Sequence, residues 1–293
     1  MTVRLLYETH MHTPLCRHAV GRPVEYAAMA WRRGLKGIIV TDHGPAPEGW
    51  IPSRQMTVAQ FPIYLEMVAE ARREWHGRLD VRLGVEQEYF PGIESFIENI
   101  NRAAPFDYVL GSVHTPCREY RERFYTGDAI AYQRLHFDHL ACCAETKLYD
   151  CLAHPDIVKN CFPSSWNLKL IMDDVCRSLD RIARTGIAME LNTSGVRKDV
   201  PEMNPGPVIL KEMNLRKIPV VLGGDAHVSG QTGAHFEEAL EMLEVAGYTY
   251  VSVFLQRRRT EIPIADAIAS LQEHQIEEEA VHHGCRHGPD SVR

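Results

Sequence analysis

The segment Tyr7–His18, which reads YETHMHTPLCRH, follows a short apolar run that is typical of a β-strand. It supplies three imidazoles, from His10, His12 and His18. Side chains two residues apart on an extended backbone point to the same side, so His10 and His12 can reach one cation, while His18 lies on the following loop. An H-x-H pair alone is equally consistent with histidines that are hydrogen-bonded in a core. The rest of the chain decides between the two interpretations.

The remainder of the chain repeats one pattern, a predicted strand that ends in polar residues and is followed by a predicted helix. After the first strand near residues 3–7, strands are predicted over 36–43, 79–89, 106–114, 151–155, 187–193, 218–227 and 248–254, and helices over 23–34, 61–75, 93–102, 129–146, 168–185, 207–216 and 236–246. This alternation indicates parallel βα units. Seven strands, or eight with the final one, fit a barrel better than an open sheet, which periodicity alone does not exclude. We expect a single barrel domain over residues 1–260, then a short helix near 264–271 and a flexible His-rich tail within 261–293.

The bulk composition excludes several classes of protein. With 45% hydrophobic and 24% charged residues, the 293-residue chain has the composition of an ordinary globular protein. A net charge of -7 argues against binding to a nucleic-acid backbone, which needs a basic excess. No apolar run is long enough to span a membrane, and the first residues lack the features of a secretory signal, so we expect a cytoplasmic protein. The eight cysteines form no C-x-x-C pair, which predicts reduced thiols.

Metal-capable side chains occur at the carboxyl ends of nearly every predicted strand, which favours a barrel because an open sheet concentrates such residues at one switch point. They are His10, His12, His18, His43, Glu86, His114, His154, Asp225 and His227. So many imidazoles and two carboxylates at one barrel mouth have no obvious source of stability unless cations neutralise and orient them. Imidazole with carboxylate suits zinc, iron or manganese, and nine ligands are too many for one ion. The sequence therefore predicts a multinuclear metal centre.

These residues lie in a series of short motifs that resembles the polymerase and histidinol phosphatase (PHP) domain family, and more narrowly its monofunctional L-histidinol-phosphate phosphatases. The motifs are H-x-H with His18 six residues later, Asp-His-Gly-Pro at 42–45, Gly-Val-Glu at 84–86, Gly-Ser-Val-His at 111–114, Ala-His-Pro-Asp at 153–156, Asn-Thr-Ser-Gly-Val-Arg at 192–197 and Gly-Asp-Ala-His at 224–227. The resemblance runs from about residue 5 to 254. It implies an α/β fold of the distorted (β/α)7 barrel type, with a trinuclear metal site at the carboxyl ends of the strands.

The resemblance also implies how the ligands are shared among three divalent ions. His10, His12, Glu86 and Asp225 would hold the first ion; Glu86 would bridge to a second, completed by His114 and His154; and His18, His43 and His227 would hold the third. Arg197 matches a phosphate-binding arginine of this phosphatase type. Asp42 and Asp156 each adjoin a ligand, and they either orient imidazoles, protonate the leaving alkoxide or are ordinary turn residues.

The predicted reaction is hydrolysis of a phosphate monoester, most specifically L-histidinol phosphate in histidine biosynthesis. Three divalent ions outweigh two carboxylate ligands, which attracts phosphate, and a water bridging two ions would supply hydroxide for in-line attack on phosphorus. One alternative is another small phosphate monoester or a nucleotide-derived substrate, and another is a non-catalytic metal-binding module. The sequence leaves open the metal, the general acid, the oligomeric state and the role of the polar segment Cys117–Asp128. His282, His283, Cys285 and His287 resemble an adventitious metal-binding tail, and His136 and His139 have a spacing that can bind zinc on a helix outside the barrel.

Overall fold

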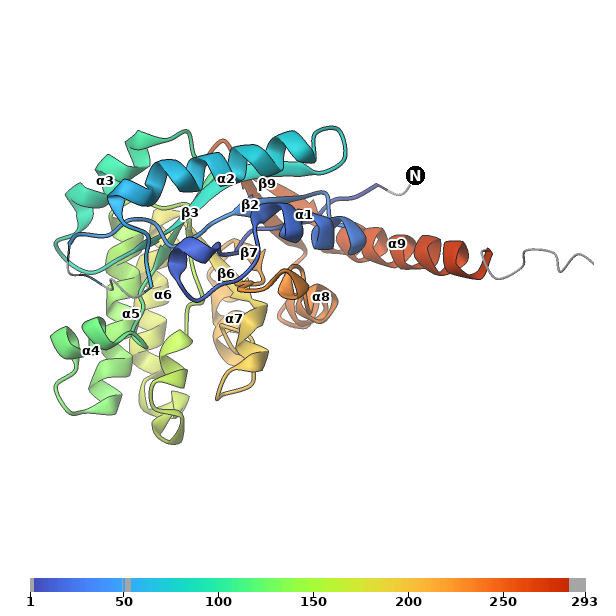
Figure 1. Cartoon of the computed structure of the whole chain (residues 1–293). Helices are drawn as coiled ribbons and strands as arrows, with labels where there is room; N and C mark the ends of the chain where they lie inside the picture. Colours follow the sequence, from blue (N-terminus) through green and yellow to red (C-terminus); the bar gives the residue numbers. More distant parts are fainter. Residues whose placement is uncertain (1–2, 49, 51–53, 285–293) are drawn as a thin grey trace, which may run out of the picture.

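A parallel sheet that follows the order of the chain forms the centre of the protein, and helices surround it (Figure 1). The computed structural model describes residues 3–48, 50 and 54–284. The strands are β1 (Tyr7–Glu8), β2 (Gly37–Val40), β3 (Asp80–Glu88), β4 (Tyr108–Ser112), β5 (Cys151–Leu152), β6 (Ala188–Asn192), β7 (Val220–Gly223), β8 (Tyr250–Leu255) and β9 (Arg258–Pro263). The helices are α1 (Pro23–Arg32), α2 (Phe61–Glu74), α3 (Glu94–Ala103), α4 (Arg118–Phe124), α5 (Ala129–Glu145), α6 (Met172–Thr185), α7 (Pro207–Leu215), α8 (Phe236–Val245) and α9 (Ile264–Gly284). The predicted α/β barrel is confirmed.

The barrel closes between β1 and β7, immediately beyond the ends of both strands. Met11 pairs with Ala226 in a parallel bridge, in which the His12 amide donates to the Ala226 carbonyl at 2.9 Å and the Ala226 amide donates to the His10 carbonyl at 3.0 Å. Seven strands thus complete the ring. β8 pairs with β7 through Val221 and Ser252, outside this closure, and β9 adds to β8 in antiparallel fashion. The eighth predicted strand is therefore present, but it lies outside the closed ring. This arrangement makes the barrel a distorted one.

Apart from the longer and more polar β3, the strands that form the ring are short and buried, as expected of parallel strands covered by helices. All four residues of β2 and all five of β6 are buried. Helix α2 is attached to this core by Tyr64, whose hydroxyl group lies 2.8 Å from the Val40 carbonyl and 2.7 Å from the Gly84 carbonyl. Because apolar side chains fill the inside of the barrel, the polar residues that follow each strand are left at its carboxyl end.

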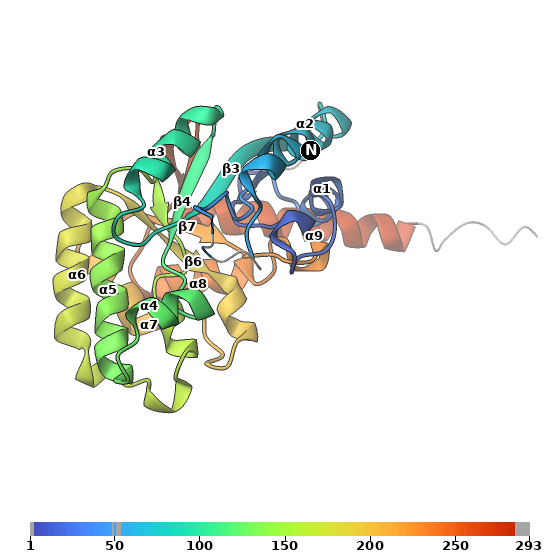
Figure 2. The same ribbon diagram turned by 60° about the vertical axis from the view of Figure 1, so that its left-hand side comes forward.

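The segment Cys117–Asp128, predicted only as a polar excursion, contains the short helix α4. Figure 2 shows α4 in front of α5, and α5 and α6 side by side. The Tyr120 hydroxyl of α4 is hydrogen-bonded to Nδ1 of His139 in α5. This contact explains why His139 is buried, and it gives His139 a structural role in holding α4.

The C-terminal part of the chain corrects two expectations. The strand β9 was not predicted, and the proposed boundary at residue 260 falls within it. The helix expected over residues 264–271 continues to Gly284, since the added residues are mostly good helix formers. His274 of this helix donates from Nε2 to the Arg32 carbonyl of α1 at 2.8 Å, so α9 is attached to the barrel. The end of the expected tail, residues 285–293, lies outside the described residues. None of the described helices combines the length and the apolar character that a membrane span requires.

Candidate metal centre

The nine predicted ligand residues converge at the carboxyl ends of the strands, with Glu86 at their centre. Glu86 is the seventh residue of β3, and its carboxylate is surrounded by imidazoles. Oε2 lies 2.8 Å from Nδ1 of His43 and 3.4 Å from Nε2 of His10, and Oε1 lies 3.1 Å from Nε2 of His154 and 3.3 Å from Nε2 of His114. Imidazoles thus lie against both oxygens of this buried carboxylate, with Nε2 of His12 a further neighbour at 3.8 Å from Oε2.

Asp225 is the second carboxylate of the cluster and follows β7. Its Oδ1 lies 3.1 Å from Nε2 of His12 and 3.4 Å from Nδ1 of His227. Its Oδ2 accepts hydrogen bonds from Oγ of Ser194 at 2.9 Å and from Nζ of Lys198 at 3.3 Å. Asp225 thus connects the histidines of the first loop with the segment after β6.

The ligand atoms form groups that are compact enough to hold ions. Each of the following groups has its ligand atoms within 4.8 Å of one another: His10, His12 and Glu86; His43, Glu86 and His114; His12, His43 and His227; and Cys16, His18 and His227. These groups overlap with the three predicted sets but divide the histidines differently around His43. Cys16 joins His18 and His227 in the last of these groups as a buried thiol.

Several buried polar atoms of the cluster have no hydrogen-bond partner among the described residues. They are Nε2 of His10, Nδ1 of His154, Nε2 of His227 and Oε2 of Glu86, whose 2.8 Å contact with Nδ1 of His43 is not aligned as a hydrogen bond. A buried polar atom without a hydrogen bond costs about 1–3 kcal/mol. Four such atoms in one cluster are therefore expected only where another group satisfies them. Divalent cations fit this donor set of imidazole nitrogens and carboxylate oxygens.

A second set of carboxylates holds the imidazoles from behind. Glu190 lies 2.7 Å from Nδ1 of His10, and Glu88 lies 2.8 Å from Nδ1 of His114. Asp42 lies 3.3 Å from Nδ1 of His12. When Nδ1 donates to a carboxylate, Nε2 is left as the free lone pair, and the ring is turned so that this atom faces the centre.

The two aspartates considered as proton donors occupy different positions. Asp42 is fully buried; it accepts from the His43 amide at 2.9 Å and from the hydroxyl of Thr13, in addition to its contact with His12. Asp156 accepts from Nζ of Lys159 at 3.2 Å and from the Gly206 amide at 2.9 Å. A cavity opens over this cluster, and neither aspartate is among its described lining residues. Asp42 thus orients His12, whereas Asp156 connects the loop after β5 with the segment before α7.

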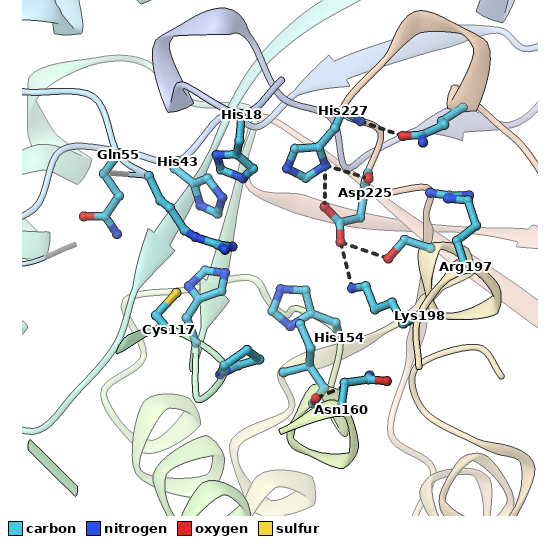
Figure 3. A pocket seen from close by; sticks show the side chains of 16 residues that line it. His18, His43, Gln55, Cys117, His154, Asn160, Arg197, Lys198, Asp225 and His227 are labelled. Atoms are coloured by element: carbon cyan, nitrogen blue, oxygen red, sulfur yellow. Dashed lines mark hydrogen bonds and ion pairs between the residues drawn. The ribbon is translucent and has the colours of Figure 1, made fainter. Parts of the chain in front are cut away.

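A cavity of about 400 Å³ opens over the cluster, and we call it the metal cavity (Figure 3). Arg197 lies on its wall, where Nη2 donates to the Gly224 carbonyl at 3.3 Å, and Lys198 lies beside it next to Asp225. Arg54 also lines the cavity. Sequence patterns did not single out Lys198, although it directly follows the predicted phosphate-binding arginine. The cavity therefore combines possible metal ligands with three cationic side chains.

Burial and mutual contact set the protonation of the cluster. Burial alone would raise the pKa of Glu86, but the imidazoles of His43, His10 and His114 outweigh it and hold that pKa well below normal. Burial lowers the pKa of His43 to about 3, despite the nearby Glu86. His12 is the opposite case: burial would lower its pKa, but Asp225 and Asp42 raise it to about 9. A bound cation would replace the proton on this ring, because metal ligation requires neutral imidazole.

Comparison with known proteins gives consistent matches over most of the chain. The family model of the PHP domain matches residues 8–194. A probable histidinol-phosphatase of Deinococcus radiodurans is 37% identical over 257 residues, covering 83% of this chain and 95% of the relative. A histidinol-phosphatase of Bacillus subtilis is 27% identical and covers 79% of this chain and 97% of its own length.

Solved structures show the same fold. The chain superposes with a TM-score of 0.74 on histidinol phosphate phosphatase of Lactococcus lactis, a structure in complex with zinc, L-histidinol and phosphate. The match covers 87% of this chain and 98% of that one at 18% sequence identity. A similar match, with a TM-score of 0.70, is to a putative histidinol phosphatase of Listeria monocytogenes. At this identity the structural similarity establishes the fold and nothing finer.

Proposed function

The chain belongs to the PHP domain family, and we propose that it is a cytoplasmic, metal-dependent phosphatase that hydrolyses L-histidinol phosphate. The observation that carries this proposal is the position of Glu86 among four imidazoles, directly below a cavity with cationic side chains on its wall. The similarity to histidinol-phosphatases over most of the chain supports the substrate. The proposed partner is thus a small phosphate monoester, with no nucleic acid or membrane involved.

The proposed ligands would hold three divalent ions, chosen from zinc, iron and manganese. The first ion would be bound by His10, His12, Glu86 and Asp225, the second by Glu86, His114 and His154, and the third by His18, His43 and His227. The compact groups of ligand atoms and the unpartnered atoms on four of these residues support this assignment. Bound divalent ions supply positive charge for the phosphate and activate water for attack on phosphorus.

The side chains on the wall of the metal cavity would bind the substrate. Arg197 is held by the Gly224 carbonyl, which leaves its other guanidinium nitrogens for two oxygens of a phosphate group. Lys198 adds a second positive charge next to Asp225. Asp42 is hydrogen-bonded to His12 and would hold that imidazole in place, and Asp156 is paired with Lys159 and would hold its loop in place. Neither aspartate would therefore contact the oxygen of the leaving group.

The decisive experiment is phosphate release by metal-loaded enzyme from L-histidinol phosphate and from a panel of other monoesters, including nucleotides. A strong preference for L-histidinol phosphate supports the proposal. Equal and slow rates on every ester would keep the metallophosphatase and reject the substrate. No release from any ester, with metal content verified, would instead point to a non-catalytic metal-binding module.

A further inference from the structure

Lys159 is a fully buried lysine in the helical turn η3 (Ile157–Asn160). Its ammonium group contacts Oδ2 of Asp156 at 3.2 Å, Oε1 of Glu202 at 3.2 Å and the Met203 carbonyl at 2.9 Å. An ammonium group has three N–H donors, so all of them are used. A buried ion pair is weak evidence for stability, because removing two charges from water offsets most of their attraction. The contacts of Lys159 therefore point to a role other than stability.

These contacts fix the residues that follow Arg197 in the sequence. Glu202 and Met203 belong to residues 198–206, which we call the return segment. Asn160, the neighbour of Lys159 in η3, adds a further contact, since its Oδ1 accepts from the amide of residue 200 at 3.0 Å. Asn160 and Arg197 both line the metal cavity (Figure 3). The turn η3 thus holds the return segment at two places, next to the wall of that cavity.

The return segment in turn supports η6 (Thr193–Arg197), whose last residue would bind phosphate. Asn204 pairs with Asn192 in an antiparallel bridge, with backbone hydrogen bonds of 2.7 and 3.0 Å. A Cβ on Gly195 would overlap the Glu202 carbonyl oxygen, so η6 and the return segment are in direct contact and a glycine is needed between them. The backbone that presents the phosphate-binding arginine is therefore held by the segment that η3 fixes.

We propose that Lys159 is a positioning residue for phosphate binding, which acts on Arg197 through the return segment; the inference rests on the proposed function. Lys159 is buried and is not among the described residues that line the metal cavity, so it acts without contacting the substrate. The hydrogen bond from Arg197 to the Gly224 carbonyl is long, at 3.3 Å, so the guanidinium depends on its backbone for its position. Misplacement of a substrate-binding group by about 1 Å can lower catalysis by about 100-fold.

A second role for Lys159 has to be distinguished from this one. Lys159 also pairs with Asp156, two residues after His154, so loss of the ammonium group could disturb the proposed second ion instead. The two roles differ in the affinity that changes. Support of Arg197 affects the binding of phosphate, whereas support of His154 affects the binding of metal. Both affinities are therefore measured.

The test measures the Kd of inorganic phosphate by calorimetry on the zinc-loaded protein, which does not depend on catalysis. Lys159→Met keeps the length of the side chain and removes the ammonium group. It is expected to raise this Kd about tenfold, the value of one displaced charge-assisted hydrogen bond. Zinc affinity against a competing chelator should stay within about twofold of wild type. Lys169→Met, at an exposed position in η5 (Leu168–Leu170), is the matched control.

A double-mutant cycle shows whether the effect passes through Arg197. In the Arg197→Ala background, Lys159→Met should change the phosphate Kd by less than about twofold, because the group that it positions is already absent. An effect of equal size in both backgrounds would overturn the inference. A loss of zinc affinity in parallel with phosphate affinity would also overturn it, in favour of a role in supporting His154.

Glu202→Ala decides the matter if Lys159→Met does not fold. The Glu202 side chain is 38% exposed, and Lys159 keeps Asp156 as a partner in this variant. The phosphate Kd should still rise, by about threefold, with unchanged zinc affinity. An unchanged phosphate Kd would overturn the inference and leave the proposed function intact. Failure of the proposed function would appear separately, as a zinc-loaded wild type that hydrolyses no ester, and would remove the premise of the inference as well.

Discussion

Glu190 connects two ligands that lie far apart in the sequence. One oxygen accepts from Nδ1 of His10 at 2.7 Å, and the other accepts from the amide of His154 at 2.7 Å. A Cβ on Gly223 would lie 1.9 Å from Oε1 of Glu190, so the glycine leaves the room that this carboxylate occupies. Glu190 therefore fixes a ring proposed for the first ion and a loop proposed for the second.

Replacement of Glu190 by Gln should weaken metal binding by about 10- to 100-fold, as is usual when a carboxylate behind a ligating histidine is lost. The amide keeps the size but no longer accepts at both positions. Zinc affinity measured against a competing chelator reads the effect directly. Glu98→Gln removes an exposed carboxylate paired with Arg102 and serves as the control. Equal zinc affinity in the two variants would contradict the role given to Glu190.

Arg197→Ala should reduce kcat/KM by about 100-fold, since charge-assisted hydrogen bonds to two phosphate oxygens are lost. Initial rates over a range of substrate concentrations provide the measurement. The matched control is Arg177→Ala, which removes an exposed arginine paired with Asp174 on α6. The assignment of Arg197 fails if the two variants have similar constants.

Motifs reveal the ligands more readily than the residues that support them. His10, Glu86 and Asp225 each lie near the end of a strand within a short sequence motif, so their convergence could be predicted. Glu190 has no such pattern; its one signal is a charged residue inside an apolar strand. Its partner depends on the register between β6 and the loop after β1, which is a property of the tertiary structure.

At the level of elements, α5 contributes His136 to the loops that carry His114 and His154. His136 is fully buried; Nε2 donates to the Pro155 carbonyl at 2.9 Å, and Nδ1 lies 3.4 Å from the hydroxyl of Thr115. His136 and His139 have a spacing that can bind zinc, but Nε2 of His136 is already engaged by the Pro155 carbonyl. Burial lowers its pKa to about 3.

The depressed pKa of His136 predicts an acid-dependent loss of stability. In the unfolded chain a histidine titrates near 6.5, so the contribution of the neutral ring is complete above that pH. It is lost as the pH falls from about 6.5 towards 3, by about 1.4 kcal/mol per pH unit. In denaturant unfolding, the stability difference between wild type and His136→Asn should thus be largest above pH 6.5 and shrink below it. A stability difference that stays constant with pH would refute this account.

Helix α9 is the element whose extent was least predictable. Ile264, Ala267 and Leu271 are buried in the hydrophobic core, which makes the first half of α9 an integral part of the barrel. A sequence pattern cannot show this, because the core they join is formed by other helices, among them α1 and α8. Charged residues that follow Leu271 indicated an end of the helix, whereas they continue it.

Leu271→Ala should lower the free energy of unfolding by about 2–5 kcal/mol, the usual cost of such a cavity. Urea unfolding gives the value. Gln272→Ala, at the exposed neighbouring position, should change it by less than about 0.5 kcal/mol. An equally small effect of Leu271→Ala would mean that α9 is dispensable for the barrel.

At the scale of the whole molecule, strand periodicity left open how many strands complete the ring. The periodicity of the sequence predicts eight strands, but it does not show which two of them pair to close the ring. The closure depends on backbone hydrogen bonds between the segments around Met11 and Ala226. These segments carry His10, His12 and Asp225, so the contact that closes the barrel also brings together three of the four ligands proposed for the first ion.

Removal of metal should therefore destabilise the whole barrel as well as abolish activity. Ions that bind only the folded state stabilise it by about 4 kcal/mol at a thousandfold excess over Kd. Dialysis against a chelator should lower the melting temperature, and added zinc, iron or manganese should restore it together with phosphatase activity. Metal analysis should give three ions per chain. The residues His282, His283, Cys285 and His287 could bind extra metal and raise the measured number, so the measurement is repeated with these four residues replaced by Ser. A chelated protein that melts at the original temperature would show that the clustered imidazoles and carboxylates are stable without ions, and the argument for a metal centre would fail.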